Sequence, residues 1–551
     1  MASRLTVKSL DVSRIACTPV KPKILAKYLE TYPDQSVSRL LTEGFSFGFY
    51  LQYSGPRLHV EYENLKSINA HENEAIEVVM KEVELGRKAG PFSLPPLQNL
   101  RVSPVGLIPK KDGSWRLIHH LSYPDGSSVN HHIDQNLCTV HYTPFDTALE
   151  MLAKLGKGAL AARLDIKSAF RLFPIHPSDF ELLGYKIDNL YFVDKCLPFG
   201  CSISCALFEK FATFLEWELK KRSKSDNVVH YLDDFLVAGE KETDDCVKLM
   251  DCYKNLCDEL GVPLAIEKTI GPTSCITYLG LEIDTNDMLV RIPSEKIEKL
   301  RSALISLINK NKTTLKELQS LTGLMNFCTR AIPSSRAFSR RFYDAMSGLK
   351  KHVHKRRVNN EMKEDIRVWL TFLEFFNGST YYDLTPWVDS DYLKLFTDSA
   401  GNSTLGCAAI LAKQWVFMPW PLSWHNQPLM KDITFLELVP ITLSFFIWGE
   451  SLRSKKIVLY TDNKALVSVL NKKSCKSARV MKLLRPLVLI SMKLDIQFKS
   501  FHIEGKHNIA ADALSRQQFL KFHQTIPEAD GSPMSIPLSF QNLLSSVDVT
   551  K

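Results

Sequence analysis

The chain contains 551 residues, 45% of them hydrophobic and 23% charged, a composition typical of a soluble folded protein of about two to four domains. It has no apolar run near the ~20 residues that cross a bilayer, no signal-peptide pattern at its N-terminus and no Cys-x-x-Cys zinc spacing among its twelve cysteines; we therefore expect an intracellular protein, cytoplasmic or nuclear, that is not secreted and has no membrane partner. The net charge of +9 favours a polyanionic partner.

Residues 1–90 are predicted to form an N-terminal extension of short helices, for which the sequence indicates no function. Between residues 76 and 88 the apolar positions follow helical spacing, and Gly90-Pro91 is expected to end this helix. Three prolines then predict an extended link into the next domain: Pro91, Pro95 and Pro96.

Residues 91–290 alternate apolar strands with helical patterns, which predicts an α+β or α/β domain. Two short apolar runs flank Asp233-Asp234, and the simplest prediction is a β-hairpin with both acids at its turn. Exposed turn aspartates are common, but the buried-strand pattern of residues 160–164 also ends in an acid, Asp165. Acids at a strand end and a facing hairpin can bracket two Mg²⁺ ions about 3.5–4 Å apart, because Mg²⁺ prefers oxygen ligands.

Beyond the acidic turn Tyr231-Leu232-Asp233-Asp234, four further segments resemble the reverse transcriptases in that family's order: residues 105–118, 197–200, 261–268 and 278–283. The resemblance implies that residues 105–118 are the fingers hairpin and that residues 278–283 are the primer grip. It also implies that Asp165, Asp233 and Asp234 bind Mg²⁺ in a polymerase palm. Because neighbouring strand residues point to opposite faces, Asp233 and Asp234 need not contribute equally, and we predict Asp233 as the principal ligand.

The same resemblance implies contacts with the incoming nucleotide near the fingers hairpin. Lys110 or Lys111, together with Arg116, would hold the triphosphate, a task suited to cationic donors. Gly200, in Leu197-Pro198-Phe199-Gly200, would allow the nucleotide and template to approach closely.

Two more residues take roles from this resemblance. Phe170 follows Asp165 where the family carries an aromatic gate that would exclude a 2′-hydroxyl; the alternative is a core phenylalanine. Lys268 would act as general acid toward pyrophosphate, and an ordinary surface lysine explains it equally well.

Residues 291–350 are predicted to be a helical thumb, and residues 351–391 a connection or linker with a helix near 361–376. Basic runs occur at residues 220–224 and 350–357. Contact with a polyanion and a solvated face explain these runs equally well.

Residues 392–516 contain a second α/β pattern with four separated acids: Asp398, Glu437, Asp462 and Asp512. Two follow strands and two lie in helical segments, so all four can converge on one metal pair that drives phosphodiester hydrolysis. Asp398-Ser399-Ala400 alone also fits a degenerate aspartic-protease signature, but the three later acids favour the metal site. In order and context this segment resembles ribonuclease H, which implies metal-binding roles for all four acids.

Three further features of the C-terminal part concern a proline, two histidines and the tail. Pro440 lies just inside the helix predicted around Glu437, a position tolerable only near a first turn. Many ribonucleases H carry a histidine before the last aspartate, and the sequence does not select between His502 and His507. Prolines at positions 527, 533 and 537 predict an irregular tail over residues 517–551.

Residues 119–130 and 318–327 resemble the DIRS-type retrotransposons, which are mobilised by a tyrosine recombinase. The likeness covers residues 20–540 and implies the reverse transcriptase and ribonuclease H region of an LTR-type retroelement polyprotein, with other retroelement proteins such as a recombinase as partners. The histidine pairs within residues 119–132 match no recognised metal set, and a structural or RNA-facing role is favoured.

Together these interpretations predict an α+β multidomain chain: a right-hand polymerase with fingers, palm and thumb, then a connection and an α/β ribonuclease H-like domain. The predicted function is an RNA-directed DNA polymerase whose second site hydrolyses the RNA of RNA/DNA hybrid. Its partners would be RNA template, DNA primer, hybrid and deoxynucleoside triphosphates, with two Mg²⁺ per site, replaceable by Mn²⁺. Alternatives are a catalytically silent nucleic-acid-binding descendant, which should have lost carboxylates, and a DNA-templated polymerase, which has no use for ribonuclease H.

Overall fold

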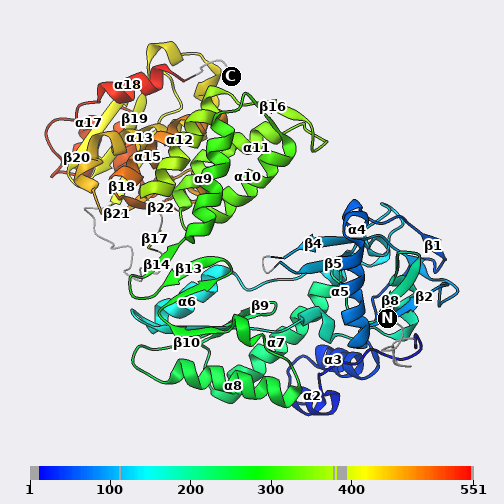
Figure 1. Ribbon diagram of the computed structural model, residues 1–551. Helices are drawn as coiled ribbons and strands as arrows, with labels where there is room; N and C mark the ends of the chain where they lie inside the picture. Colours follow the sequence, from blue (N-terminus) through cyan, green and yellow to red (C-terminus); the bar gives the residue numbers. More distant parts are fainter. Residues whose placement is uncertain (1–10, 111–112, 376–378, 381–393, 548–551) are drawn as a thin grey trace. The chain divides into compact units, whose positions relative to one another are not determined.

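The computed structural model describes residues 11–110, 113–375, 379–380 and 394–547 (Figure 1). The chain divides into two compact units, unit 1 with residues 1–279 and 283–288, and unit 2 with residues 280–282 and 289–551. Within the described ranges, no helix has both the length and the apolar character that crossing a bilayer requires. The predicted α+β multidomain architecture is confirmed.

The N-terminal residues pack into the core of unit 1. Helices α2 (Pro22–Leu29) and α3 (Gln35–Phe47) contribute Leu25, Leu41 and Phe45 to the buried cluster that also contains the central strands. The Asp34 side chain caps α3 by accepting the backbone N–H groups of its first turn. The boundary predicted at residue 90 therefore lies inside a compact unit.

The helix predicted to run to Gly90 ends earlier. Helices α4 (Lys66–Ala70) and α5 (Glu72–Glu84) are followed by Gly86 at φ +70°, a conformation that glycine adopts without steric cost at a helix end. Lys88–Phe92 is then strand β2 rather than an extended link, because it pairs with β8 (Leu190–Asp194).

Unit 1 contains two sheets and a separate hairpin. The five-stranded sheet has the order β1-β3-β7-β8-β2, in which β1 is Val60–Glu61, β3 is Arg101–Val102 and β7 is Gly184–Ile187. The hairpin of β4 (Val105–Pro109) and β5 (Trp115–His119) confirms the antiparallel pair predicted over residues 105–118.

The second sheet of unit 1 carries the predicted polymerase acids. Its order is β11-β6-β10-β9, with β11 at Ile270–Thr273, β6 at Leu160–Asp165, β10 at Asp234–Gly239 and β9 at Val228–Tyr231. Helices α7 (Ser204–Ser223) and α8 (Asp245–Leu260) cover it, and Phe211, Phe235 and Tyr253 join these elements in one core. Helix α6 (Phe145–Leu155) also contacts β10. A further sheet, β12-β13-β14-β17 (Cys275–Tyr278, Leu281–Asp284, Leu289–Arg291 and Ser379–Thr380), contains the residues at which the chain passes between units.

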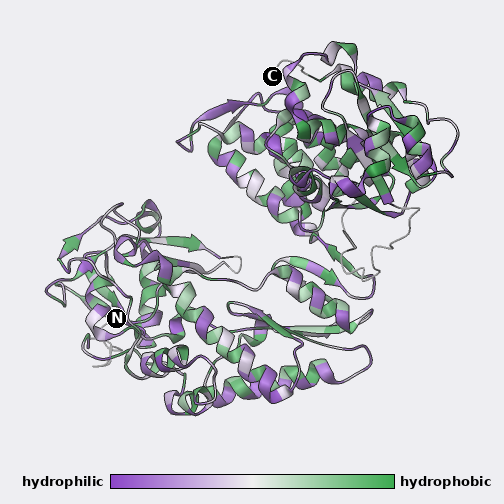
Figure 2. Cartoon of the chain, turned by 180° about the vertical axis from the view of Figure 1, so that it is seen from behind, coloured by the Kyte–Doolittle hydropathy of each residue, from purple (hydrophilic) through white to green (hydrophobic). Residues whose placement is uncertain are grey.

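Unit 2 begins with the predicted helices. They are α9 (Ser294–Ile308), α10 (Leu315–Cys328), α11 (Arg340–Met346) and α12 (Asn360–Phe375). These helices confirm the helical predictions for residues 291–350 and 361–375, and residue 376 lies outside the described residues. The basic run at 350–357 ends in strand β16 (Lys355–Arg357), which pairs with β15 (Lys312–Thr314). All three β16 side chains are exposed, and this ribbon is hydrophilic in Figure 2.

The rest of unit 2 is a five-stranded sheet with helices. Its order is β20-β19-β18-β21-β22, with β18 antiparallel to β19 and parallel to β21. The strands are β18 (Lys394–Ser399), β19 (Gly406–Leu411), β20 (Gln414–Pro419), β21 (Lys456–Thr461) and β22 (Gln497–His502). The helices are α13 (Ile433–Trp448), α14 (Lys464–Lys472), α15 (Ala478–Lys493) and α16 (Ile509–Ser515).

The prediction of an irregular C-terminal tail is wrong over two segments. Helices α17 (Phe519–Thr525) and α18 (Leu538–Ser545) bury Phe522 and Phe540. The three tail prolines lie outside both helices, and Pro537 immediately precedes α18, where a missing N–H costs no helical hydrogen bond.

Candidate active sites

The predicted acidic hairpin is formed by β9 and β10. Tyr231 pairs with Asp234 across the hairpin, so only Leu232 and Asp233 form the loop. Leu232 adopts φ +52°, the left-handed conformation that tight hairpin turns require. The hairpin prediction is therefore confirmed.

The end of β6 brings Asp165 to this hairpin. Asp165 is the residue directly opposite Asp234 in the antiparallel β6–β10 pair. The backbone N–H of Ile166 donates to the carbonyl oxygen of Asp233 at 3.1 Å, which fixes the turn against the strand end. The three acids that the sequence predicted to converge are thus neighbours.

Burial and mutual repulsion perturb these acids. Burial and the nearby Asp165 raise the pKa of Asp233 to about 6. Burial also raises the pKa of Asp234, although Arg163, whose Nε lies 3.8 Å from Asp234 Oδ1, opposes the shift. A bound cation would relieve this repulsion, so the donor set fits a hard divalent metal.

Lys268 lies directly against the acids. Its Nζ donates to Asp165 Oδ1 at 2.8 Å and to Oδ2 at 3.1 Å. Burial lowers the pKa of Lys268, but the hydrogen bond to Asp165 and the charges of the three acids together outweigh it, so the pKa is raised overall. Lys268 therefore stays protonated at neutral pH, as a proton donor must; its assignment as general acid remains a prediction.

A buried histidine within the hairpin was not singled out from the sequence. His230, on β9, forms an ion pair through Nδ1 with Glu216, and its Nε2 lies 3.3 Å from Glu209. Burial alone would lower the pKa of His230, but these two α7 carboxylates raise it to about 9. The protonated ring fastens the hairpin to α7. No local sequence pattern indicates these contacts, because Glu209 and Glu216 lie on another element, away from His230 in the chain.

Of the predicted triphosphate contacts, Lys110 and Arg116 are exposed at the end of the β4–β5 hairpin, whereas Lys111 lies outside the described residues. The Arg116 guanidinium lies 4.8 Å from the ring centroid of Phe199. Half-buried Phe170 also contacts Phe199, with ring centroids 5.3 Å apart. The predicted gate and cation therefore share one aromatic neighbour.

Gly200 has a structural requirement of its own. It adopts φ +115°, and a Cβ atom there would lie 2.0 Å from the carbonyl oxygen of His119. The loop thus depends on glycine for its contact with β5. Close approach of a nucleotide remains a prediction.

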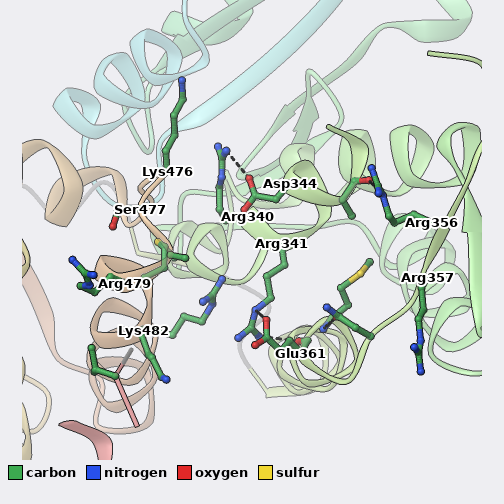
Figure 3. A pocket seen from close by; sticks show the side chains of 17 residues that line it. Arg340, Arg341, Asp344, Arg356, Arg357, Glu361, Lys476, Ser477, Arg479 and Lys482 are labelled. Carbon is green, nitrogen blue, oxygen red and sulfur yellow. Dashed lines mark hydrogen bonds and ion pairs between the residues drawn. The ribbon is translucent and has the colours of Figure 1, made fainter. Parts of the chain in front are cut away.

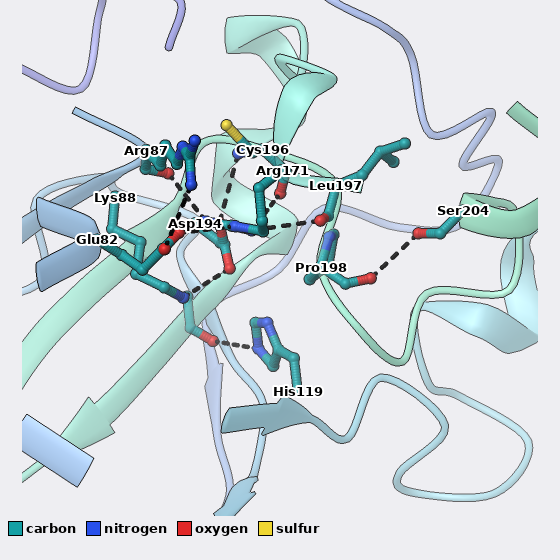
Figure 4. A network of polar contacts seen from close by, with 11 residues as sticks. Glu82, Arg87, Lys88, His119, Arg171, Asp194, Cys196, Leu197, Pro198 and Ser204 are labelled. Carbon is teal, nitrogen blue, oxygen red and sulfur yellow. Dashed lines mark hydrogen bonds and ion pairs between the residues drawn. The ribbon is translucent and has the colours of Figure 1, made fainter. Parts of the chain in front are cut away.

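A buried polar network supports the same loop (Figure 4). Asp194 accepts from Lys88 Nζ at 2.6 Å and lies 2.8 Å from Arg171 Nη1. Arg171 also donates to the carbonyl oxygens of Cys196 and Leu197, which lead into the loop. Burial alone would raise the pKa of Asp194, but the two cations lower it to about 2. This network therefore ties the five-stranded sheet to residues 197–200.

The second group of acids converges on the sheet of unit 2. Asp398 lies on β18, Glu437 on α13 and Asp462 just after β21, and one carboxylate oxygen from each lies within 4.8 Å of the others. Burial raises the pKa of Asp398 to about 6, and burial with the charges of Asp398 and Asp462 raises that of Glu437 well above its usual range. Glu437 Oε2 is buried without a hydrogen-bond partner in the described part of the chain. This unpaired oxygen and the clustered charges fit a divalent cation.

Asp512 is placed near these three but is engaged elsewhere. It lies on α16, and its charge contributes to the raised pKa of Asp398. Its Oδ1 accepts from Arg516 Nε at 2.6 Å. Ser515, which the sequence analysis did not identify, donates its hydroxyl to Asp398 Oδ2 at 2.5 Å.

Pro440 contradicts the expectation that proline is tolerable here only near the first turn. It is the eighth residue of α13, which continues through Trp448. Proline removes the N–H that would bond to the carbonyl of Leu436. That carbonyl instead accepts the Ser399 hydroxyl at 2.8 Å, so the lost helical bond is replaced by one from β18.

The two candidate histidines differ in their relation to the acids. Both histidines are exposed. His502 Nε2 lies 3.1 Å from the carbonyl oxygen of Asp462, whereas His507 lies in the short 3₁₀ turn Gly505–His507. Of the two, His502 is therefore the one held beside an acidic residue.

Residues 108–283 match the family model described as "Reverse transcriptase (RNA-dependent DNA polymerase)". The Gag-Pro-Pol polyprotein of Mason-Pfizer monkey virus is 25% identical over 257 residues, 45% of this chain and 13% of the relative. The Transposon Tf2-7 polyprotein of Schizosaccharomyces pombe is 22% identical over 531 residues, 94% of this chain and 36% of the relative. A foamy viral protease-reverse transcriptase solved with dsDNA has a TM-score of 0.48 and 15% identity, covering 89% of this chain and 99% of that one.

The segment that matches the reverse transcriptase model contains β6, β9, β10 and all three predicted polymerase acids, Asp165, Asp233 and Asp234. The chain spans 13% and 36% of the lengths of the two curated relatives.

Proposed function

We propose that this chain is an RNA-directed DNA polymerase with a second site that hydrolyses the RNA strand of RNA/DNA hybrid. The observation that carries the proposal is the pairing of Asp165 with Asp234 beside Asp233, within the segment that matches the reverse transcriptase model. The carboxylate cluster of unit 2 supports the second activity.

At the first site, Asp165 and Asp233 would hold the metal ions, with Asp234 as a further ligand restrained by Arg163. When bound, two Mg²⁺ ions favour deprotonation of the attacking hydroxyl and stabilise the leaving oxygen. Lys268 holds a proton within reach of Asp165. Arg116 and Lys110 would orient the triphosphate by charge-assisted hydrogen bonds.

At the second site, Asp398, Glu437 and Asp462 would hold the metal ions, and Mg²⁺ would activate water there. Ser515 orients Asp398 through its hydroxyl. Asp512 would join the ligands after releasing Arg516, and His502 would move a proton near Asp462.

The polymerase proposal is tested by extending an oligo(dT) primer on poly(rA) with Mg²⁺. We expect extension by the wild type and a loss of at least about 10²-fold in Asp233→Asn, because the variant lacks a ligand charge. Asp244→Asn is a matched control, since Asp244 is exposed and its side chain makes no cap hydrogen bond. Absence of wild-type extension, with both variants folded, would favour the catalytically silent alternative.

The second site is tested separately with a labelled RNA/DNA hybrid. Asp462→Asn should abolish cleavage and leave primer extension intact, whereas Asp233→Asn should do the reverse. Asp495→Asn is the control, because exposed Asp495 has a left-handed φ of 51° that asparagine tolerates. Cleavage that survives Asp462→Asn would exclude this site.

We also propose the type of retroelement, a neighbouring protein and the location of the chain in the cell. The segment at residues 119–130 supports a DIRS-type element, and a tyrosine recombinase encoded beside this chain would be the expected neighbour. An intracellular location is consistent with twelve free cysteines.

A further inference from the structure

A strongly basic cavity lies within unit 2. Its volume is about 850 Å³, and it is lined by α11, β16, the start of α12 and the first half of α15 (Figure 3). Of its seventeen lining residues, eight are Arg or Lys and two are Asp or Glu. None of these described lining residues belongs to either carboxylate cluster.

The cations come from elements distant in the sequence. Figure 3 shows Arg479 and Lys482 on one ribbon and Arg356 and Arg357 on another, with Arg340 and Arg341 between them. Like charges gathered from separate elements repel one another. The fold therefore holds them together at a cost that a bound anion would remove.

Internal acids neutralise only part of this charge. Arg340 pairs with Asp344 at 2.6 Å, and Arg341 lies 2.8 Å from the buried Asp365. Arg479 Nη1 lies 3.6 Å from Asp432 Oδ2. This distance is longer than a hydrogen bond.

Several buried donors remain without acceptors. Nε and Nη2 of Arg479 and Nε of Arg485 make no hydrogen bond within the described ranges, although these side chains are only 13% and 14% exposed. Burial lowers the pKa of Arg485 despite the opposing charge of Asp365. Buried guanidinium groups without acceptors are costly, which indicates that an acceptor-rich ligand belongs beside them.

The start of α15 adds to the positive potential. Ser477 caps this 16-residue helix, and Lys476, Ser477, Ala478 and Arg479 all line the cavity. Its first backbone N–H groups and the helix dipole both favour an anion there.

We propose that this cavity binds a compact anion carrying several closely spaced phosphate groups, of the class of inorganic polyphosphate. Planar guanidinium groups match phosphate oxygens in pairs, and the volume lies within the usual range of small-molecule sites. Nucleic acid also carries phosphates, but a duplex presents them along its outer surface. A compact ligand can enter and reach the buried donors of Arg479 and Arg485.

The test is calorimetric titration of the full chain with sodium tripolyphosphate, at constant ionic strength and without divalent metal. We expect binding by the wild type and at least about tenfold weaker binding by Arg479→Gln/Lys482→Gln, since two charged contacts are lost. The second variant, Lys476→Gln/Lys482→Gln, also loses two cavity charges and should likewise bind more weakly. It leaves the Arg479–Asp432 pair in place. Lys493→Gln/Lys521→Gln loses the same charge at exposed positions outside the cavity and should bind like the wild type.

Two further arms separate other sources of binding. Arg116→Gln identifies tripolyphosphate bound at the predicted triphosphate contact. Weaker binding by Arg116→Gln, with unchanged binding by Arg479→Gln/Lys482→Gln, would place the anion at that contact and overturn the proposal. An RNA/DNA hybrid should retain its affinity for Arg479→Gln/Lys482→Gln. Equal weakening in the exposed control, or loss of hybrid binding without loss of tripolyphosphate binding, would overturn the proposal.

Discussion

At the scale of single residues, backbone pairing positions two of the three predicted polymerase acids, Asp165 and Asp234. Asp165 and Asp234 are direct partners across β6 and β10, whereas Asp233 occupies the loop. Burial and the nearby Asp165 raise the pKa of Asp233 to about 6. That Asp233 is the principal metal ligand stays a prediction.

Phe170→Ala should admit ribonucleotides. The ring contacts Phe199, and its removal would open space for a 2′-hydroxyl. Sugar discrimination in primer extension should fall by at least about tenfold, the usual scale for a steric difference of this size. Phe170→Tyr keeps the ring and should keep the discrimination. Unchanged selection in Phe170→Ala would identify Phe170 as a core residue.

The chemistry of individual residues was more predictable than their partners. Asp165, Asp398 and Asp462 could be identified because each follows an apolar strand. The Ser515–Asp398 and His230–Glu216 contacts join residues 117 and 14 positions apart. No local pattern in one sequence encodes such contacts.

At the scale of elements, the interior proline of α13 depends on a neighbouring strand. Ser399→Ala should destabilise the protein by about 1–2 kcal/mol, because the Leu436 carbonyl would lose its partner while buried. In a Pro440→Ala background the restored N–H can bond to this carbonyl, so the same change should cost much less. Urea unfolding of the four proteins measures this coupling, and additive effects would refute it.

The β9–α7 contact should make stability depend on pH. The pKa of His230 is raised to about 9 from a reference value of 6.5, so its stabilising effect is fully present below pH 6.5 and is lost as pH rises toward 9. The total is at most about 3 kcal/mol. Urea unfolding between pH 6 and 9.5 should show this loss in the wild type and a flatter profile in His230→Gln. Parallel profiles would contradict it.

Elements with strong local signals were predicted well, and those defined by distant pairing were not. The acidic hairpin and the helices of residues 291–350 matched their patterns. Strand β2 was mistaken for a link because only its pairing with β8 makes it a strand. Tail helices α17 and α18 were missed because prolines between short helices resemble those of an irregular segment.

At the scale of the whole molecule, the net charge of +9 predicts hybrid binding that is sensitive to salt. Raising salt from about 50 to 200 mM should weaken binding by about 10²-fold or more, because phosphate contacts release counterions. Fluorescence anisotropy measures the effect. Asp233→Asn should leave the salt slope unchanged, since a carboxylate makes no phosphate contact. Affinity independent of salt would exclude a backbone-dominated interface.

The division of the chain was only partly visible in its sequence. Composition predicted several domains, but the N-terminal helices gave no sign that they complete the core around Phe211 and Phe235. Likewise, the predicted thumb, connection and ribonuclease H-like segments all lie in unit 2. Whether predicted segments belong to one compact unit depends on long-range packing between amphipathic faces. An amphipathic pattern does not identify the element against which it packs.

The buried triad of Lys88, Arg171 and Asp194 limits how this sequence can diverge. Losing Asp194 alone would leave Lys88 buried without a carboxylate partner and leave Arg171 with Glu82 alone, whose Oε2 lies 2.8 Å from Arg171 Nε. A well-packed apolar set can replace such a group as a whole. Among relatives, these three positions should therefore change together, from charged to apolar, and intermediates with a single replacement should be rare. Covariation at positions 88, 171 and 194 would then mark descent through this particular loop support.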